Sequence, residues 1–194
     1  MLSEKLKNYR IILASKSPRR QDALKHLGLD FEVRLNPIKE VYPDYLKHSE
    51  ISNYLSKLKA TPFIKDLNPI DLLITSDTIV WHNNQALGKP KDKNDAYNML
   101  KSLSGSTHEV ITSITFTMQK WTKTVHDITK VIFKPLSDDE IYYYINRYQP
   151  FDKAGSYGIQ EWIGQIAITH IEGSFFNVVG LPTHLLYNTL MELP

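Results

Sequence analysis

The sequence predicts an α/β fold built on a mixed β-sheet. Segments rich in apolar and β-branched residues, which are typical of buried strands, alternate along the chain with segments whose apolar residues recur at helical spacing. Turn and capping residues, mainly Gly, Pro, Asn and Asp, separate these segments. A chain in which helices and strands interleave in this way forms a sheet with helices packed against its faces.

The first predicted elements are a strand, a helix and a second strand. Residues 10–14 are mostly apolar and predict a buried strand. Ser17 is a favourable N-cap, and the proline after it is accepted at the first position of a helix, so a helix is expected at residues 18–27. Gly28 is expected to end this helix, because glycine readily takes the left-handed conformation found after a helix C-terminus. A second strand is expected at residues 31–35.

Helical spacing returns after residue 50 and is followed by a hairpin. The apolar residues that predict this helix are Ile51, Tyr54, Leu55 and Leu58. The helix must end or kink near Pro62, because proline lacks a backbone N–H group. Residues 72–81 are apolar and β-branched around a polar centre and predict a strand. The two asparagines that follow predict a turn into a second arm that runs toward Leu87.

The second half of the chain is expected to continue in the order helix, two strands, helix, strand, helix. These elements are a helix capped by Asp92 and ended by Gly105, strands at residues 109–118 and 125–133, a helix opened by the capping box of Ser137 and Glu140, a strand at residues 165–171, and a helix beginning at Pro182. The apolar faces of the first two helices are formed by Ala96, Met99, Leu100 and Leu103 and by Ile141, Tyr144, Ile145 and Tyr148.

The composition is that of a globular protein. The 194 residues are 42% hydrophobic and 23% charged, which is enough for one substantial core, so a single domain spanning residues 1–194 is expected. Cysteine is absent, which excludes disulfides, thiolate metal sites and a cysteine nucleophile. The seven histidines show no HExxH pattern or close HxH pair, so a zinc site is not expected.

Charge and hydropathy limit the partners. The formal net charge is only +2, without a long block of one sign, which argues against a polyanion such as duplex DNA. The polar opening residues are followed by only a short apolar run, so neither a signal peptide nor a membrane span is expected. A cytoplasmic location is therefore predicted.

Two arginines stand where an isolated helix would least favour them. Arg19 and Arg20 fall in the first turn of the helix expected after Ser17, where each cation faces the positive end of the helix dipole at a cost of roughly 0.3–1 kcal/mol. An anionic ligand would make this placement of the arginines favourable, and the free N–H groups of a helix N-terminus bind phosphate. The segment LASKSPRR therefore favours a phosphate site, and two solvated arginines on a surface helix are the alternative.

Other candidate residues are spread along the chain. Asp77 lies inside an apolar strand, where an unpaired carboxylate is costly, so it needs a cation, a metal ion or several donors. Glu40 and Lys59 are ordinary at their expected positions, a loop and the last turn of a helix, unless they have partners. Lys89 stands between a glycine and a proline, outside any Walker A pattern. Residues 152–160, DKAGSYGIQ, contain two glycines that permit a close backbone approach.

Taken together, these candidates are four cations and two acids. They are Arg19, Arg20, Lys59, Lys89, Glu40 and Asp77. This set suits the hydrolysis of a triphosphate, because cations neutralise phosphate oxygens while two carboxylates hold a divalent metal ion. One of the carboxylates can orient or deprotonate the attacking water, so no nucleophile from the chain is required.

The motifs resemble those of the Maf family of nucleoside triphosphate pyrophosphatases. Six blocks match the family pattern in the same order through nearly the whole chain. They are LASKSPRR, the SDT of residues 76–78, the GKP of residues 88–90, LSGSTHEVIT, DKAGSYGIQ and GSFFNVVGLP. A single block could arise by chance, whereas six in order are highly specific.

The resemblance implies a fold and a reaction. The fold would be related to that of the inosine triphosphate pyrophosphatases, with a long twisted sheet, flanking helices and two lobes around a cleft that holds the substrate. The reaction would be hydrolysis of a nucleoside triphosphate between the α and β phosphates, giving a monophosphate and pyrophosphate, with Mg²⁺ or Mn²⁺ as the divalent metal cation. A homodimer is implied by the family alone.

The resemblance also implies roles for individual residues. Asp77 would be the proton acceptor and a metal contact, and Glu40 would assist the metal ion. The phosphate-binding residues would be Ser15, Ser17, Arg20, Lys59 and Lys89. Within the family, SPRR, a threonine after the acid and a glutamine closing AGxYGIQ mark the branch that resembles dTTP/UTP pyrophosphatases. Arg19, Thr78 and Gln160 would then be the specificity positions, and modified pyrimidine triphosphates remain open as substrates.

The sequence departs from the family pattern at three places. Lys16 replaces the small residue that is common in the first loop, and Glu161 and Trp162 replace a glycine-rich continuation after the glutamine. These differences bear on base preference more than on catalysis. Around Lys59, LSKLKA stands for the usual LAxxKA.

Three alternative functions stay open. One is a nucleotide-binding regulator of cell division or septum formation that acts without turnover. The presence of Asp77, Glu40 and Lys89 argues against it, because a binding protein has no need to retain a hydrolytic acid. Another is a pyrophosphatase for 7-methyl-GTP, a branch that usually carries an aromatic residue where Arg19 stands. The third is a nucleic-acid-binding protein, which requires a basic face that the sequence does not show.

Overall fold

The computed structural model describes residues 1–193 and contains one seven-stranded mixed sheet. Its strands are β1 (Arg10–Leu13), β2 (Glu32–Val33), β3 (Asp71–His82), β4 (Gln85–Leu87), β5 (Thr107–Met118), β6 (Trp121–Phe133) and β7 (Ile168–Glu172). Six of them follow the order β2-β1-β3-β5-β6-β7, and β4 pairs with β3 off this path. β1 is parallel to β2 and β3, and the other pairs are antiparallel, which confirms the predicted mixed sheet.

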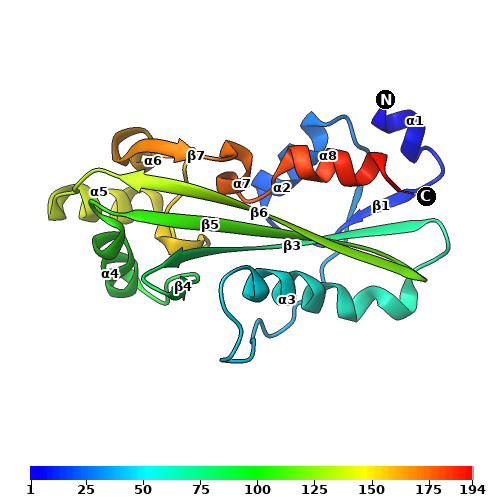
Figure 1. The fold of residues 1–194 in the computed structure, drawn as a ribbon, viewed down its shortest axis with the longest axis horizontal. Helices are drawn as coiled ribbons and strands as arrows, with labels where there is room; N and C mark the ends of the chain where they lie inside the picture. Colours follow the sequence, from blue (N-terminus) through cyan, green and yellow to red (C-terminus); the bar gives the residue numbers. More distant parts are fainter. Residues whose placement is uncertain (194) are drawn as a thin grey trace.

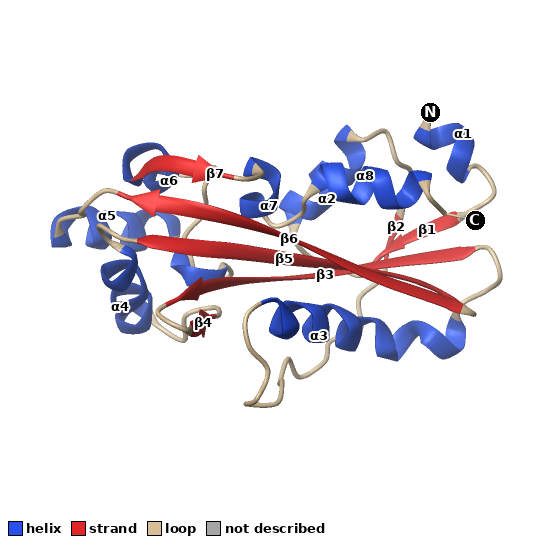
Figure 2. Cartoon of the chain, viewed as in Figure 1, coloured by secondary structure: helices blue, strands red, loops and turns tan. Residues whose placement is uncertain are grey.

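Helices cover the sheet along its length (Figure 2). Within the described residues the α-helices are α1 (Leu2–Leu6), α2 (Pro18–His26), α3 (Ser49–Ala60), α4 (Lys93–Leu103), α5 (Asp138–Tyr148), α6 (Trp162–Ala167), α7 (Phe175–Val179) and α8 (Thr183–Met191), with 3-10 helices η1 (Thr61–Asp66) and η2 (Ala154–Ser156). None of the helices within residues 1–193 is long and apolar enough to cross a membrane.

Three long strands connect the two largest hydrophobic clusters of the described residues, which form a core at each end of the molecule. β3, β5 and β6 run through the molecule, with α4, α5 and α6 at one end and α1, α8 and β1 at the other (Figure 1). β5 contributes to both cores, because Val110 packs with the α4 and α5 side chains, whereas Phe116 packs with Leu24 of α2 and Leu186 of α8. This arrangement agrees with the two lobes that the family resemblance implies.

Local signals in the sequence account for most element boundaries. The turn after β3 places Asn83 and Asn84 at φ values of 48° and 59°, as a tight hairpin requires, and asparagine tolerates this conformation. Ser137 and Glu140 form the predicted capping box of α5. Gly28 follows α2 with a φ of 71°, so the predicted end of that helix is confirmed.

Other sequence predictions were wrong in detail. The strand expected at residues 165–171 begins only at β7, because the preceding turn forms α6, whose buried Ile163 and Ala167 lie four residues apart. A glycine inside α6 makes this possible, since a Cβ atom on Gly164 would approach the carbonyl oxygen of Ile159 to 1.9 Å. β2 has only two exposed residues instead of five, and the short helices α1 and α7 were not expected.

The inner face of α3 is more polar than its sequence pattern predicts. Tyr54, expected on that face, is 37% exposed. Ser52 and Ser56 are buried instead and hydrogen-bond to β5, with Oγ–Oγ of 2.7 Å to Ser113 and Oγ–Oγ1 of 2.8 Å to Thr115. These bonds let a helix lie close to polar strand residues, because each buried hydroxyl finds a partner.

Candidate active site

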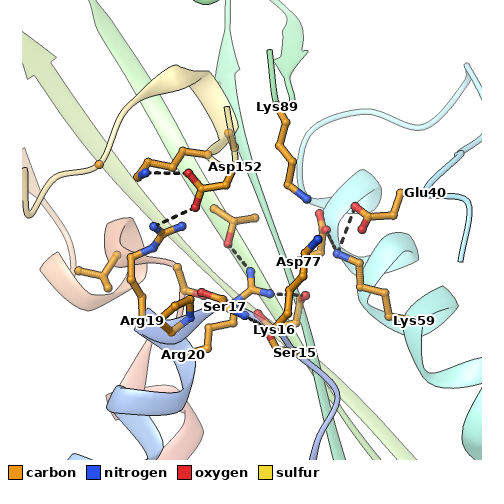
Figure 3. A pocket seen from close by; sticks show the side chains of 18 of the residues that line it. Ser15, Lys16, Ser17, Arg19, Arg20, Glu40, Lys59, Asp77, Lys89 and Asp152 are labelled. Atoms are coloured by element: carbon orange, nitrogen blue, oxygen red, sulfur yellow. Dashed lines mark hydrogen bonds and ion pairs between the residues drawn. The ribbon is translucent and has the colours of Figure 1, made fainter. Parts of the chain in front are cut away.

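A cavity of about 840 Å³ lies beside residues 76–80 of β3. It is lined by residues from five segments, within residues 14–20, 35–40, 76–80, 149–160 and 178–180, together with single residues elsewhere. All ten residues proposed from the sequence line it, although they come from distant parts of the chain. Figure 3 labels eight of them, all except Thr78 and Gln160. The volume is in the range of small-molecule sites.

The cavity opens where β1 ends beside β3. The last pair of these parallel strands joins Leu13 to Ile74, after which the chain turns away into α2. The edge of β3 beyond that pair faces the cavity with its backbone and with two functional side chains. Since alternate residues point to opposite faces of a sheet, Asp77 faces α3 and Thr78 faces α2 and α7.

Lys59 joins the two acids on the α3 side of the cavity. Its Nζ lies 2.5 Å from Oδ1 of Asp77 and 3.3 Å from Oε2 of Glu40 (Figure 3). The second oxygen of Asp77, Oδ2, is buried and has no hydrogen-bond partner within residues 1–193. The carboxylate predicted to need a cation therefore has one, and its second oxygen is left without a partner among the described residues.

The two carboxyl groups respond differently to their surroundings. Burial raises the pKa of Asp77, and the opposing attraction of Lys59 does not overcome it. Burial acts in the same direction on Glu40, but the attraction of Lys59 and Lys89 outweighs it, so the pKa of Glu40 is lowered. Opposite pKa shifts of two neighbouring acids are typical of sites that separate a base from a charged binding group.

The two carboxylates fit a divalent metal ion. Among the described residues, no cluster of three or more His, Cys, Asp or Glu side chains with metal-site geometry is present. Mg²⁺, however, commonly takes one or two protein carboxylates and completes its shell with water and substrate phosphates. Asp77 and Glu40, with the unpartnered Oδ2 of Asp77, satisfy that requirement.

Arg20 is partly buried and bonded mainly to backbone. It donates from Nη1 to the carbonyl oxygen of Ser76 at 2.8 Å and from Nε to that of Gly180 at 2.9 Å. Its Nη2 donates to Oγ1 of Thr78 at 3.0 Å. Burial lowers its pKa, although the guanidinium stays charged. These bonds tie α2 to the edge of β3 beside Asp77 and leave only part of the guanidinium for a ligand.

The hydroxyl of Thr78 is already engaged by the protein. It accepts from Arg20 and lies 3.0 Å from Oγ1 of Thr112, which in turn donates to the carbonyl oxygen of Asn177 in α7. A hydroxyl has one proton to donate, so the chain is consistent when Thr78 donates to Thr112. Thr78 lines the cavity, and this hydrogen-bond chain fixes its rotamer.

A second charged group lies on the opposite wall, in the loop before α6. Arg19 donates from Nη1 to Oδ2 of Asp152 at 3.3 Å, and Asp152 accepts from Nζ of Lys153 at 2.7 Å. Lys153 is buried and also lies 3.0 Å from Oε1 of Glu161. Tyr144 donates to Glu161 and accepts the backbone N–H of Gly158 at 3.1 Å. This network supports the loop that ends in Gln160.

The turn before α2 is stabilised by its own side chains. Ser15 accepts the backbone N–H of Ser17 at 3.2 Å through its Oγ, and Gln21 donates to the carbonyl oxygen of Ser15 at 3.3 Å. Ser17 is the N-cap of α2, as predicted, but its side chain makes no capping bond. Lys89 follows a glycine whose carbonyl accepts the N–H of Gly155 at 3.0 Å, which brings its loop beside the DKAGSYGIQ segment.

Sequence reasoning missed part of this cavity. Asp152 and Lys153 begin a segment that was singled out for its glycines, so their charges were a usable signal. Glu161 was noted only as a departure from a family pattern. Its bond to Tyr144, 17 residues earlier, joins a loop to a helix that periodicity alone cannot bring together.

Comparison with known proteins decides the family. The family model described as "Maf-like protein" matches residues 10–193. The chain belongs to the Maf family. Similar Maf proteins include the dTTP/UTP pyrophosphatase of Flavobacterium johnsoniae, 57% identical with both chains fully covered, and that of Flavobacterium psychrophilum, 58% identical over 99% of this chain and 98% of the relative. A third, from Christiangramia forsetii, is 52% identical over 100% of this chain and 98% of the relative.

Two solved structures are similar at low sequence identity. The Staphylococcus aureus Ham1 protein aligns with this Maf chain at a TM-score of 0.45 and 17% identity, covering 93% of this chain and 99% of that one. A nucleoside-triphosphatase, dITP/XTP pyrophosphatase, from Mycobacterium abscessus aligns at a TM-score of 0.42 and 14% identity, covering 66% and 76%. Both likenesses are too distant to bear on the site of this Maf chain.

Proposed function

We propose that this Maf protein is a nucleoside triphosphate pyrophosphatase that hydrolyses dTTP and UTP to the monophosphate and pyrophosphate. The observation that carries the proposal is the cavity in which Asp77, Glu40 and Lys59 face a wall that carries Arg19 and Gln160. Asp77, Glu40 and Lys59 suit the reacting phosphates, whereas Arg19 and Gln160 suit the nucleobase. Relatives more than 50% identical over essentially their whole length bear the name dTTP/UTP pyrophosphatase.

Asp77 acts as the proton acceptor in this proposal. A water oxygen attacks the α phosphorus, the bond between that phosphorus and the oxygen bridging to the β phosphorus breaks, and the proton of the water passes to Asp77. Its Oδ2 is free of protein partners in the described chain, and burial raises its pKa toward the range in which a carboxylate is an effective base. Lys59 holds the other oxygen and fixes the orientation of the carboxylate.

Asp77 and Glu40 are also the residues that would hold a divalent metal ion, Mg²⁺ or Mn²⁺. When bound, such an ion polarises phosphate oxygens and helps to neutralise the charge that develops on the leaving group. The lowered pKa of Glu40 keeps this carboxylate ionised at neutral pH, which is the form a cation requires.

The remaining residues bind either the phosphates or the nucleobase of the substrate. Phosphate contacts come from Lys89, Lys59 and the Ser15 to Ser17 turn, whereas Arg20 mainly positions the strand edge through its three protein hydrogen bonds. Arg19 and Gln160 lie on the base side, and the Gln160 amide can pair with a pyrimidine edge.

Pyrophosphate release from a panel of nucleoside triphosphates, with Mg²⁺ or Mn²⁺ and with chelator, tests the proposal. Metal-dependent release highest on dTTP and UTP is expected, and modified pyrimidine triphosphates belong in the panel. If release were highest on 7-methyl-GTP, the reaction type would be supported and the predicted nucleobase preference would be contradicted. Nucleotide binding without release would favour the regulator of cell division. A cytoplasmic location, a homodimer and a single domain over residues 1–194 remain predictions from the sequence.

A further inference from the structure

The cavity holds more positive charge than its acids neutralise. Three carboxylates line it, those of Glu40, Asp77 and Asp152. Six cationic side chains line it as well, Lys16, Arg19, Arg20, Lys59, Lys89 and Lys153. An excess of this kind favours a polyanionic ligand. Cations that have no protein partner can bind such a ligand without losing an existing interaction.

Four of the six cations already have protein partners. Lys59 bridges two carboxylates, and Arg19 is paired with Asp152. Lys153 is buried against Asp152 and the glutamate that follows Gln160. Arg20 is bonded to two carbonyl oxygens and a hydroxyl. A phosphate that recruited any of these groups as its main contact would have to weaken a bond that the folded protein already makes.

Lys16 and Lys89 are different. Neither makes a hydrogen bond or an ion pair within residues 1–193, yet both line the cavity. Lys16 leaves the turn between Ser15 and Ser17, and its side chain projects into the cavity (Figure 3). It is solvent-exposed, whereas Asp77 is only 5% exposed. The α phosphate must reach the buried acid, so the outer phosphates extend toward the mouth, where a hydrated lysine can meet them.

We propose that Lys16 is a further phosphate-binding residue, which together with Lys89 holds the β and γ phosphates of the substrate. The inference rests on the proposed function, and it assigns a role to Lys16, one of the residues at which the sequence departs from the family pattern. Lys16 binds the part of the substrate that becomes pyrophosphate, so it contributes affinity for triphosphate and pyrophosphate and none for the monophosphate.

Three variants test this role. Lys16→Ala removes the charge, Lys16→Arg retains it, and Lys39→Ala removes a similar exposed charge from the adjacent loop at a residue that does not line the cavity. We expect Lys16→Ala to raise both KM for dTTP and the inhibition constant of inorganic pyrophosphate by about 5- to 20-fold, in line with loss of one charge-assisted hydrogen bond. The kcat should stay within about twofold, and Lys39→Ala should match the wild type.

Further measurements separate phosphate binding from a general effect. The dissociation constant of dTMP, measured by calorimetry, should be unchanged in Lys16→Ala, and Lys16→Arg should restore most of the affinity for pyrophosphate. The difference between the wild type and Lys16→Ala should shrink as the ionic strength rises, because salt screens an exposed charge.

Several results would overturn the role of Lys16. They are an unchanged inhibition constant for pyrophosphate, an equal loss of dTMP affinity, or a fall in kcat without a change in KM. Failure of the wild-type protein to hydrolyse any triphosphate would instead contradict the proposed function, and direct binding of pyrophosphate would still test Lys16. The two failures are therefore distinguishable.

Discussion

Replacement of Asp77 by asparagine should separate catalysis from stability. The amide keeps the size and shape of the carboxylate, but it cannot accept a proton from water. Loss of a general base lowers kcat by about 10²- to 10⁴-fold, equivalent to about 3–5 kcal/mol of transition-state stabilisation. Loss of a metal contact acts in the same direction, so we expect turnover of dTTP near the limit of detection.

The same substitution should not destabilise the fold. Burial raises the pKa of Asp77 in the folded protein above its unfolded value, so the ionised form disfavours folding. The protonated form contributes stability that is fully present below the unfolded pKa and is lost as the pH rises through the folded pKa. Asparagine does not titrate, so the variant is spared this loss. The melting temperature of Asp77→Asn relative to that of the wild type should therefore increase as the pH rises. Lys59 keeps Glu40 as a partner at 3.3 Å.

The assay combines pyrophosphate release with thermal unfolding followed by circular dichroism. Asp22→Asn is the matched control, since Asp22 lies on the exposed side of α2, outside the cavity, and should show wild-type activity. Turnover by Asp77→Asn at the wild-type rate would refute the assignment of Asp77 as the general base. A large drop in melting temperature would refute the stability argument and leave the loss of activity without a chemical meaning.

Three further predictions concern the scaffold and the metal ion. Arg10→Met should lower the melting temperature most at neutral pH, and the deficit should narrow below about pH 4, because hydrogen bonds from Arg10 lower the pKa of buried Asp71 and that contribution disappears on protonation. Arg20→Lys should lower the free energy of unfolding by about 2–4 kcal/mol in a denaturant titration, since the single nitrogen of an ammonium cannot reach three acceptors that are arranged around three nitrogens of a planar guanidinium. Chelation should abolish pyrophosphate release yet leave the melting temperature within a few degrees, because Lys59 pairs with both acids in the absence of a metal ion.

The sequence by itself determined the local structure and the inventory of the site. Capping residues, helical spacing and the asparagine turn depend on interactions between near neighbours in the chain, so α2, α5 and the β3–β4 hairpin follow from them. A carboxylate inside an apolar strand and two arginines at a helix start are locally costly, and this cost identified Asp77, Arg19 and Arg20 as candidates.

The tertiary structure alone decided which charges are paired. Arg20 reaches the carbonyl oxygens of Ser76 and Gly180, which are 56 and 160 positions further along the chain. Lys59 joins acids from a loop and a strand. Such partners depend on where packing places side-chain ends, and a few ångströms separate an ion pair from a free cation. The sequence therefore lists Arg20 and Lys16 as similar cations, whereas the packed structure engages Arg20 with the protein and leaves Lys16 open to a ligand.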